Sequence, residues 1–134
     1  MVENKTIIGL VGPCSAGKTT LRHNLSQVGY VAKHIAQEHS YVKDMWKQIS
    51  NPDILIYLDV SYEQSMERRP INMSIEDFDE QIQRLKHARQ HADYYLDTST
   101  ISAQEVYNRV RAYLRKSNII PVSDSSGFDV IDDN

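Results

Sequence analysis

Residues 7–20 read IIGLVGPCSAGKTT. The apolar part of this stretch contains β-branched side chains and does not alternate with polar residues, which predicts a strand over residues 6–12 that is buried on both faces. The strand ends at Gly12, and a turn of small residues leads into a helix predicted over residues 18–28. A buried strand that passes through a tight turn into a helix is the first unit of an α/β fold.

The turn itself, GPCSAGKT at residues 12–19, matches the pattern G-x-x-x-x-G-K-[ST] at every position. In this pattern successive backbone N–H groups curl around phosphate oxygens, and the following helix adds the positive end of its dipole. We expect Lys18 to reach the β- and γ-phosphates of a nucleotide and the Thr19 hydroxyl to bind Mg²⁺. The alternative is an ordinary glycine-rich turn. The predicted nucleotide-binding residues are Gly12, Pro13, Cys14, Ser15, Ala16, Gly17, Lys18, Thr19 and Thr20.

Cys14, inside this turn, is the only cysteine, so no disulfide can form within the chain. The end of the helix and the charge of Lys18 would favour its thiolate and its oxidation. The alternative is a small side chain that fills the turn.

Length and charge restrict the class of protein. The chain has 134 residues, which is enough for one hydrophobic core, and a formal net charge of −3 with a pI near 5.9. These values argue against a nucleic-acid or anionic membrane surface as partner. The longest apolar runs are far below the roughly 20 residues of a membrane span, and the first ten residues lack the basic flank of a secretion signal. We therefore expect a single cytoplasmic domain without a membrane partner.

The rest of the chain repeats the strand–helix rhythm. Strands are predicted over residues 30–37, 53–60 and 92–99, and helices over residues 61–69, 74–90 and from 102 onwards. Ser61 with Gln64 and Ser102 with Glu105 have the spacing of capping boxes, which mark helix starts. Residues 38–48 predict a short helix or an ordered loop. This order of elements predicts right-handed crossovers and a three-layer α/β fold, with a mostly parallel sheet of about four strands in the order 2-1-3-4.

Ligands of such sheets bind beyond the carboxyl ends of the strands, so the residues that follow each strand are the candidates for catalysis. Two acids qualify to hold Mg²⁺. Asp59 ends the apolar run ILIYLD, although it is also suited to order the turn into the next helix. Glu38 lies in QEHSYVKDMW, a mixed polar and aromatic segment typical of a functional loop, although it also suits the first turn of a helix. His39, in the same segment, is the histidine most worth testing.

Arg68 and Arg69 end the helix that follows the third predicted strand. Cations at this position can neutralise the charge that develops on a transferring phosphoryl group. The alternative is that they merely suit the negative end of the helix dipole.

Taken together, three segments resemble the P-loop kinases of the nucleoside monophosphate kinase and shikimate kinase type. They are GPCSAGKTTL, ILIYLDVSYEQSMERR and ADYYLDTSTISAQEVYNRVRAYL, which together contain a little over a third of the chain. The resemblance implies binding of ATP and Mg²⁺ and phosphoryl transfer to a nucleoside, a nucleotide or another small acceptor. It implies that Lys18 with Arg68 or Arg69 stabilises the transferring charge, and that residues 98–102 lie near the adenine.

The chain also departs from that family. Its kinases have five core strands, and the strand that would fall between residues 37 and 54 is missing here, together with the usual strand-end acid beside the phosphate loop. If residues 54–59 form the strand before the lid, Glu38 is a better candidate for the metal than Asp59. The lid is short, because Pro70 is followed closely by the helix start at Ser74.

These observations predict a small ATP-dependent kinase. The alternative is a nucleotide-binding regulatory module with weak or no transfer, which would act through a protein partner; a homodimer is also compatible with the sequence. The predicted domain covers residues 1–117, and residues 118–134 are predicted to form an acidic, flexible tail, with the alternative that Ile119, Ile120 and Val122 add a short edge piece to the domain. A third hypothesis, a GTPase, depends only on the D-x-x-G form of residues 124–127 and lacks a guanine-binding motif.

Overall fold

A computed structural model of the chain describes residues 5–122. Its four strands are all parallel and form one sheet in the order β2-β1-β3-β4, which confirms the predicted α/β fold and strand order. The strands are β1 (Ile7–Val11), β2 (Val31–His34), β3 (Ile54–Asp59) and β4 (Tyr94–Asp97). Because all four run the same way, the segments that follow them meet at one edge of the sheet.

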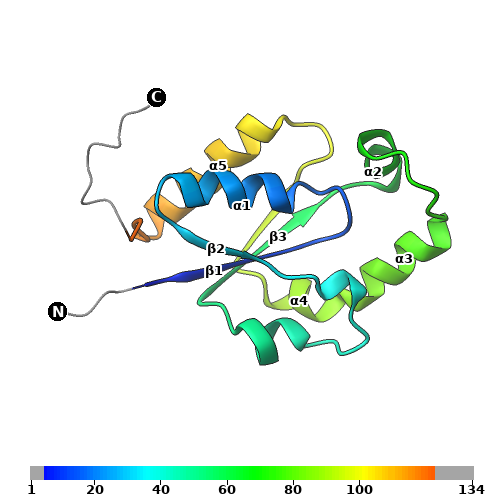
Figure 1. Cartoon of the computed structure of the whole chain (residues 1–134), viewed down its shortest axis with the longest axis horizontal. Helices are drawn as coiled ribbons and strands as arrows, with labels where there is room; N and C mark the ends of the chain where they lie inside the picture. The colour runs from blue at the N-terminus through cyan, green and yellow to red at the C-terminus, as the bar shows by residue number, and fades with distance from the viewer. Residues whose placement is uncertain (1–4, 123–134) are drawn as a thin grey trace.

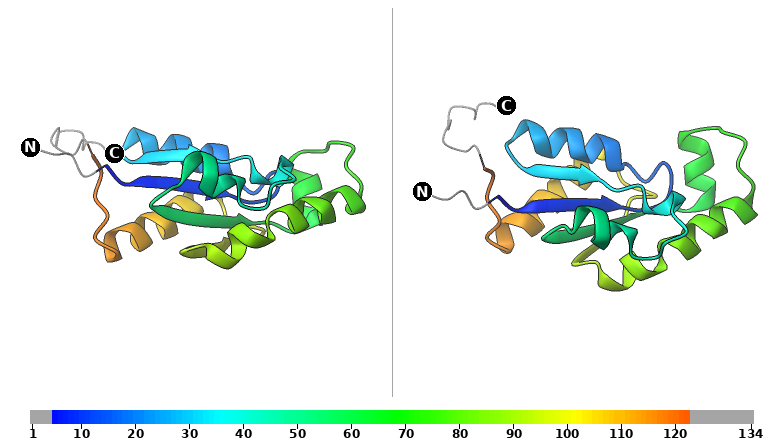
Figure 2. Two further views of the ribbon diagram at one scale, coloured as in Figure 1. Left: turned by 90° about the horizontal axis from the view of Figure 1, so that it is seen from below. Right: turned by 60° about the horizontal axis from the view of Figure 1, so that its bottom comes forward.

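Helices cover both faces of this sheet (Figures 1 and 2). One face is covered by α1 (Lys18–Gln27) and α5 (Ala103–Lys116), and the other by α4 (Lys86–His91) and the π-helical segment η2 (Trp46–Ser50). The remaining elements lie toward the carboxyl edge: η1 (Gln37–His39), α2 (Tyr62–Arg68) and α3 (Ile75–Arg84). No helix among residues 5–122 is both long and apolar enough to cross a membrane.

The apolar side chains of β1 and β3 point alternately into two hydrophobic cores, one on each face of the sheet. Leu10 and Leu58 pack with α1 and α5, whereas Val11 and Tyr57 pack with Leu85 of the opposite layer. Successive side chains of a strand point to opposite faces, and both faces are covered here. This explains why the sequence of β1 and β3 is continuously apolar instead of alternating.

Helix starts follow the predicted caps. The hydroxyl of Ser61 accepts a hydrogen bond from the Gln64 N–H at 3.2 Å, and the hydroxyl of Ser102 accepts one from the Glu105 N–H at 3.1 Å. Ser74 caps α3 in the same way. Each hydroxyl satisfies an N–H group that has no partner within its helix.

One predicted helix is divided in the structure. The single helix predicted over residues 74–90 is two helices, α3 and α4, separated at Leu85. The Leu85 N–H is shared between the carbonyls of Gln81 and Ile82, a tightening of the helix toward 3₁₀ geometry. The break leaves the Leu85 side chain fully buried in the second core.

The boundary of the domain lies beyond residue 117. Ile119 belongs to the core under α1 and α5, its carbonyl accepts a hydrogen bond from the Tyr30 hydroxyl at 3.1 Å, and the Val122 N–H donates to the Gly29 carbonyl at 2.8 Å. Ile119 and Val122, which the sequence left either to a tail or to an edge piece, therefore contact the domain, although neither forms a strand. Residues 123–134, including the D-x-x-G sequence at 124–127, lie outside the described part of the chain.

Candidate functional site

The 12–19 loop (residues 12–19) follows β1 at the carboxyl edge of the sheet, and its two glycines serve different purposes. A Cβ at Gly12 would lie 2.0 Å from the carbonyl oxygen of Leu58 in the neighbouring strand β3. Gly17 precedes the first residue of α1 with φ of +102°, and a Cβ there would meet nothing within 4 Å. The loop thus needs Gly12 for close backbone approach and Gly17 for a conformation that L residues rarely adopt.

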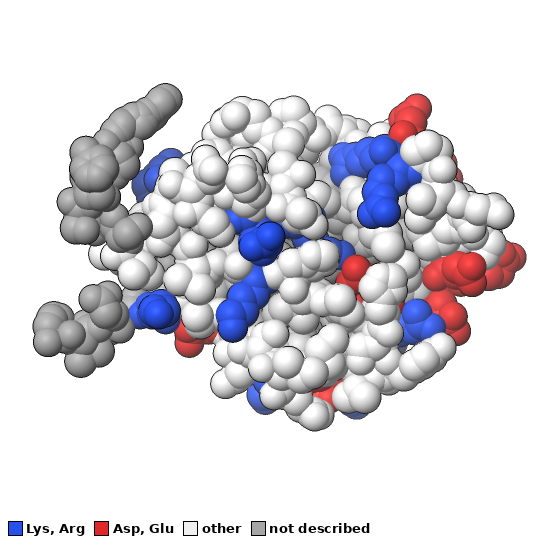
Figure 3. All heavy atoms as spheres, in the orientation of Figure 1, with Lys and Arg blue, Asp and Glu red and all other residues white. Residues whose placement is uncertain are grey.

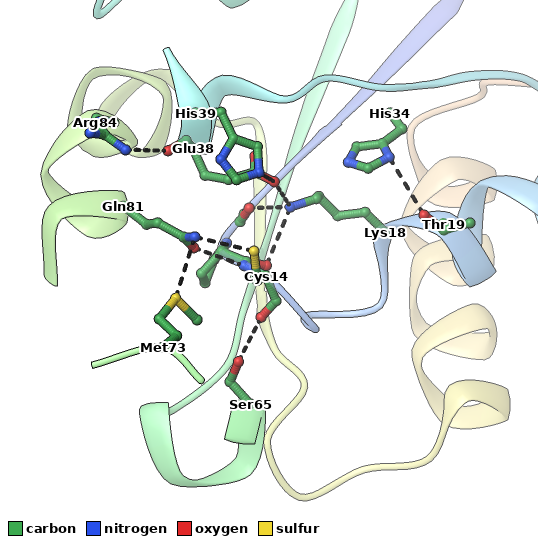
Figure 4. Close-up of polar contacts among 12 residues, drawn as sticks. Cys14, Lys18, Thr19, His34, Glu38, His39, Ser65, Met73, Gln81 and Arg84 are labelled. Atoms are coloured by element: carbon green, nitrogen blue, oxygen red, sulfur yellow. Dashed lines mark hydrogen bonds and ion pairs between the residues drawn. The ribbon is translucent and has the colours of Figure 1, made fainter. Parts of the chain in front are cut away.

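Lys18 folds back into this loop. Its Nζ donates hydrogen bonds to the carbonyl of Gly12 and, at 3.3 Å, to that of Pro13, and it lies 3.0 Å from Oε2 of Glu38 (Figure 4). The side chain is only 5% exposed. Burial lowers the Lys18 pKa below its usual value, and the charge of Glu38 opposes that shift. The ammonium group is thus a buried cation that Glu38 and two loop carbonyls neutralise.

Glu38 is placed by the short helix η1 and is 4% exposed at its side chain. Its Oε2 contacts Lys18, whereas Oε1 is buried and has no hydrogen-bond partner among the residues that the structure describes. Gln37 anchors this segment: its amide accepts a bond from the Trp46 N–H at 2.9 Å and donates to the Val42 carbonyl at 2.8 Å. The mixed segment that follows β2 is therefore an ordered loop that presents a carboxylate to the 12–19 loop.

The far side of the loop is held by Thr98, which follows β4. Its hydroxyl lies 2.9 Å from the Ala16 carbonyl and accepts a hydrogen bond from Arg68 Nη1 at 3.0 Å. Arg68 also donates to the Ser15 carbonyl at 2.9 Å and to the Thr98 carbonyl. Both arginines are exposed and line the adjoining cavity, but only Arg68 is hydrogen-bonded to the loop backbone.

Cys14 is fixed on three sides by residues from other elements. Its N–H donates to the Gln81 amide oxygen at 3.1 Å, its carbonyl accepts from the Ser65 hydroxyl at 3.0 Å, and its Sγ accepts from Gln81 Nε2 at 3.2 Å. Gln81 is buried on α3 and Ser65 on α2. The loop is therefore tied to α2 and α3 as well as to the sheet (Figure 4).

Thr19, the predicted Mg²⁺ ligand, lies next to the end of β2. Its Oγ1 is 3.5 Å from Nδ1 of His34. Burial, followed by the nearby charge of Lys18, lowers the His34 pKa, which favours the neutral imidazole. A hydroxyl and the Glu38 carboxylate are hard oxygen ligands of the kind that Mg²⁺ prefers, and the Glu38 Oε1 atom, which has no hydrogen-bond partner among residues 5–122, is compatible with that use.

These residues surround one cavity of about 610 Å³, a volume in the range of small-molecule sites. Residues 14–20 line it together with His34, Glu38, His39, Arg68, Arg69, Thr98, Ile101, Ser102, Ala103 and Val106. Gly12 and Pro13 are not in the lining but bind Lys18 through their carbonyls. Apart from Glu38 the charged lining is cationic, and Figure 3 shows Lys and Arg atoms near α2 and acidic atoms along α3. The cavity is suited to an anionic ligand.

Asp59, the second metal candidate, does not line this cavity. Its carboxylate accepts hydrogen bonds from the Val60 N–H and from the Tyr95 hydroxyl at the far side of the sheet end. Burial and this carboxylate raise the pKa of Tyr95 to about 12. Of the two acids the structure brings Glu38, and not Asp59, to Lys18.

The sequence argument missed Ser65 and Gln81, and it expected Thr98 only within a segment near the adenine, not as a support of the 12–19 loop. Each contacts the 12–19 loop across more than 50 positions of sequence, and none belongs to a local motif. The only available signal was their place after a strand or on the inner face of a helix near the expected lid.

Comparison with models of known protein families gives no match for this chain. A comparison with curated proteins gives none either.

Proposed function

We propose that the chain is a small ATP-binding kinase that transfers the γ-phosphoryl group to a small acceptor. One observation carries the proposal: a buried lysine, a threonine at the start of a helix and a buried carboxylate converge on one cationic cavity, next to a loop that follows the central strand β1. This is the arrangement that phosphoryl transfer requires, because that reaction depends on positioning and on charge stabilisation.

The residues have separate roles in the proposed reaction. The N–H groups at the start of α1 and those of the 12–19 loop, other than the engaged N–H groups of Cys14 and Ala16, bind the β- and γ-phosphates, and Lys18 moves from the loop carbonyls to the phosphate oxygens. Thr19 and Glu38 hold Mg²⁺, which when bound neutralises charge on the phosphates. The apolar lining at Ile101 and Val106 suits the flat face of a base.

The acceptor attacks from the exposed side of the cavity, where Arg69 and His39 lie. Arg69 is placed to stabilise the transferring phosphoryl group as the new P–O bond forms and the bridging oxygen leaves with ADP. Arg68 keeps the loop in shape through its bonds to the Ser15 and Thr98 carbonyls.

Calorimetric titration with ATP and Mg²⁺ tests the binding half of the proposal. We expect Lys18→Ala to lose at least about tenfold in affinity, because the lysine is the loop's own cation for the phosphates. Glu38→Gln is expected to weaken the Mg²⁺ dependence of binding, whereas Asp59→Asn serves as the matched control and is expected to leave it unchanged. Equal ATP affinity in the parent chain and Lys18→Ala contradicts the proposal.

ADP production with a panel of nucleosides, nucleotides and small alcohols tests the transfer half. Turnover with one acceptor class, abolished in Lys18→Ala, supports a kinase. The second candidate is a nucleotide-binding regulatory module, which the engagement of Arg68 with backbone carbonyls favours because it leaves fewer cations for catalysis. Tight ATP binding without turnover of any acceptor supports that candidate.

A further inference from the structure

Three potential metal ligands meet at the mouth of the 12–19 loop. Cys14 Sγ, a carboxylate oxygen of Glu38 and a ring nitrogen of His39 all lie within 4.8 Å of one another. Figure 4 shows the three side chains on the same side of the Lys18 amino group. Nε2 of His39 is 3.7 Å from Oε2 of Glu38. The cluster joins a thiol, a carboxylate and an imidazole from two segments that the fold brings together.

We propose that this cluster binds a transition-metal ion such as Zn²⁺. In a tetrahedral zinc site with Zn–S near 2.3 Å and Zn–N or Zn–O near 2.0–2.2 Å, neighbouring ligand atoms are about 3.3–3.7 Å apart. The Glu38–His39 separation already has this value, and a shift of about 1 Å brings the Cys14 sulfur within reach. Three protein ligands leave a fourth position for water, as in zinc sites that keep an open position.

The unsatisfied carboxylate of Glu38 is a second reason to expect a cation at the Cys14–Glu38–His39 cluster. Its Oε1 is buried and has no hydrogen-bond partner among residues 5–122, which is costly for a carboxylate. Lys18 contacts only Oε2, and its Nζ is also bonded to the carbonyls of Gly12 and Pro13. Glu38 therefore carries an unsatisfied carboxylate oxygen beside the Oε2 atom that faces His39.

The remaining two ligands decide which cations suit the site. His39 is 60% exposed at its side chain and has room to rotate toward the ion, whereas Gln81 holds the Cys14 sulfur in place at 3.2 Å. Thiolate and imidazole ligands favour Zn²⁺, Co²⁺ and Cu²⁺ over Mg²⁺. Binding exchanges the Cys14 thiol proton for the metal–sulfur bond, and the proton leaves to solvent, so affinity rises with pH.

This site does not depend on the proposed kinase reaction, but it shares Glu38 with it. A zinc ion held by Glu38 occupies the carboxylate that the proposed function assigns to Mg²⁺. Zinc is then expected to inhibit Mg²⁺-dependent nucleotide binding, and this consequence alone rests on the proposed function.

Titration of the untagged full chain with Co²⁺ tests the site without any nucleotide. We expect one equivalent to bind with a thiolate-to-cobalt charge-transfer absorption and the intense visible bands of a tetrahedral ion, and Zn²⁺ to displace it with loss of colour. Cys14→Ser should abolish the charge-transfer band. His39→Ala should keep that band but lower the Co²⁺ affinity by at least about tenfold, since even outer partners of metal ligands contribute 10- to 100-fold.

His23→Ala is the matched control, because His23 is an exposed histidine on α1 and should not change the titration. Far-ultraviolet circular dichroism checks that the variants are folded; His39 is largely exposed, so its variant keeps the test informative if the Cys14 variant unfolds. Cobalt binding without a charge-transfer band in the parent chain overturns the proposal. So does an unchanged affinity in His39→Ala.

Discussion

Replacing Gly12 by alanine probes the closest backbone approach in the site. The new Cβ would lie 2.0 Å from the Leu58 carbonyl oxygen and 3.0 Å from its carbonyl carbon, whereas ordinary contact begins near 3.4 Å. The obstacle is backbone of the central sheet, which cannot rotate away as a side chain would. Strands β1 and β3 must therefore separate by about 1.4 Å at this end, or the loop must change its path.

The expected loss of stability follows from that displacement. A separation of about 1.4 Å exceeds what a hydrogen bond tolerates, so about two ladder bonds near Val11 and Tyr57 are lost at about 1 kcal/mol each. The φ of +151° at Gly12 adds about 1–2 kcal/mol of backbone strain for a residue with a Cβ. We expect Gly12→Ala to lower the free energy of unfolding by about 3–4 kcal/mol.

Gly17→Ala is the matched comparison, because a Cβ there meets nothing within 4 Å and only the strain of its φ of +102° remains. Its expected loss is about 1–2 kcal/mol. Urea unfolding, followed by the fluorescence of Trp46, the only tryptophan, measures the free energy of unfolding of both variants. If Gly12→Ala lowers the free energy of unfolding no more than Gly17→Ala does, the overlap of the new Cβ with the Leu58 carbonyl does not separate β1 from β3.

Two further predictions concern the support of the site. Thr98→Val keeps the shape of the side chain but removes the hydroxyl that bonds both the Ala16 carbonyl and Arg68. The free energy of unfolding measured in urea should therefore fall by about 1–3 kcal/mol, and Thr98→Ser should recover most of it. The second concerns Trp46, whose indole N–H donates to Nδ1 of His87 at 3.1 Å, a bond that needs a neutral imidazole. Burial and the neighbouring His91 lower the pKa of His87 in the folded chain. The neutral His87 therefore contributes fully to stability above the pKa of an unfolded histidine, near 6.5, and this contribution is lost as the pH falls through the lower pKa of the folded state. Trp46 emission should change in that lower pH range, and a His87→Gln chain that shows the same change refutes this assignment.

The sequence predicted the fold well because its signals are local. Continuous apolar runs identify strands buried on both faces, and Ser61 and Ser102 mark helix starts through bonds to residues three positions away. The division of residues 74–90 at Leu85 was not predictable in this way, because the helical spacing of apolar residues continues through the break. The shared hydrogen bond of the Leu85 N–H is a detail of the backbone that side-chain periodicity does not report.

The site was predicted only in part, for a related physical reason. The motif located the 12–19 loop, but the residues that hold it in place act across the fold: Thr98 reaches Ala16, and Gln81 reaches Cys14. The sequence left Glu38 and Asp59 as alternatives, since both follow strands. Their difference lies in neighbours, because Asp59 is engaged by Tyr95 and Glu38 by Lys18.

The pairing of Lys18 with Glu38 has a thermodynamic consequence for any phosphate ligand. A phosphate that binds Lys18 must draw the ammonium group away from Glu38. The buried Glu38 carboxylate would then lose the partner of Oε2, while Oε1 already has no hydrogen-bond partner among residues 5–122. Removing one partner of a buried ion pair typically costs 3–5 kcal/mol. A cation that arrives with the phosphate and binds Glu38 removes this cost, so the phosphate and the metal should bind cooperatively, with a coupling of roughly 10²- to 10⁴-fold. The glutamine of a Glu38→Gln chain has no negative charge to bind the metal. The nucleotide affinity of that chain should therefore respond far less to Mg²⁺ than the affinity of the parent chain. An equal Mg²⁺ response in both chains would mean that Lys18 does not leave Glu38 when phosphate binds.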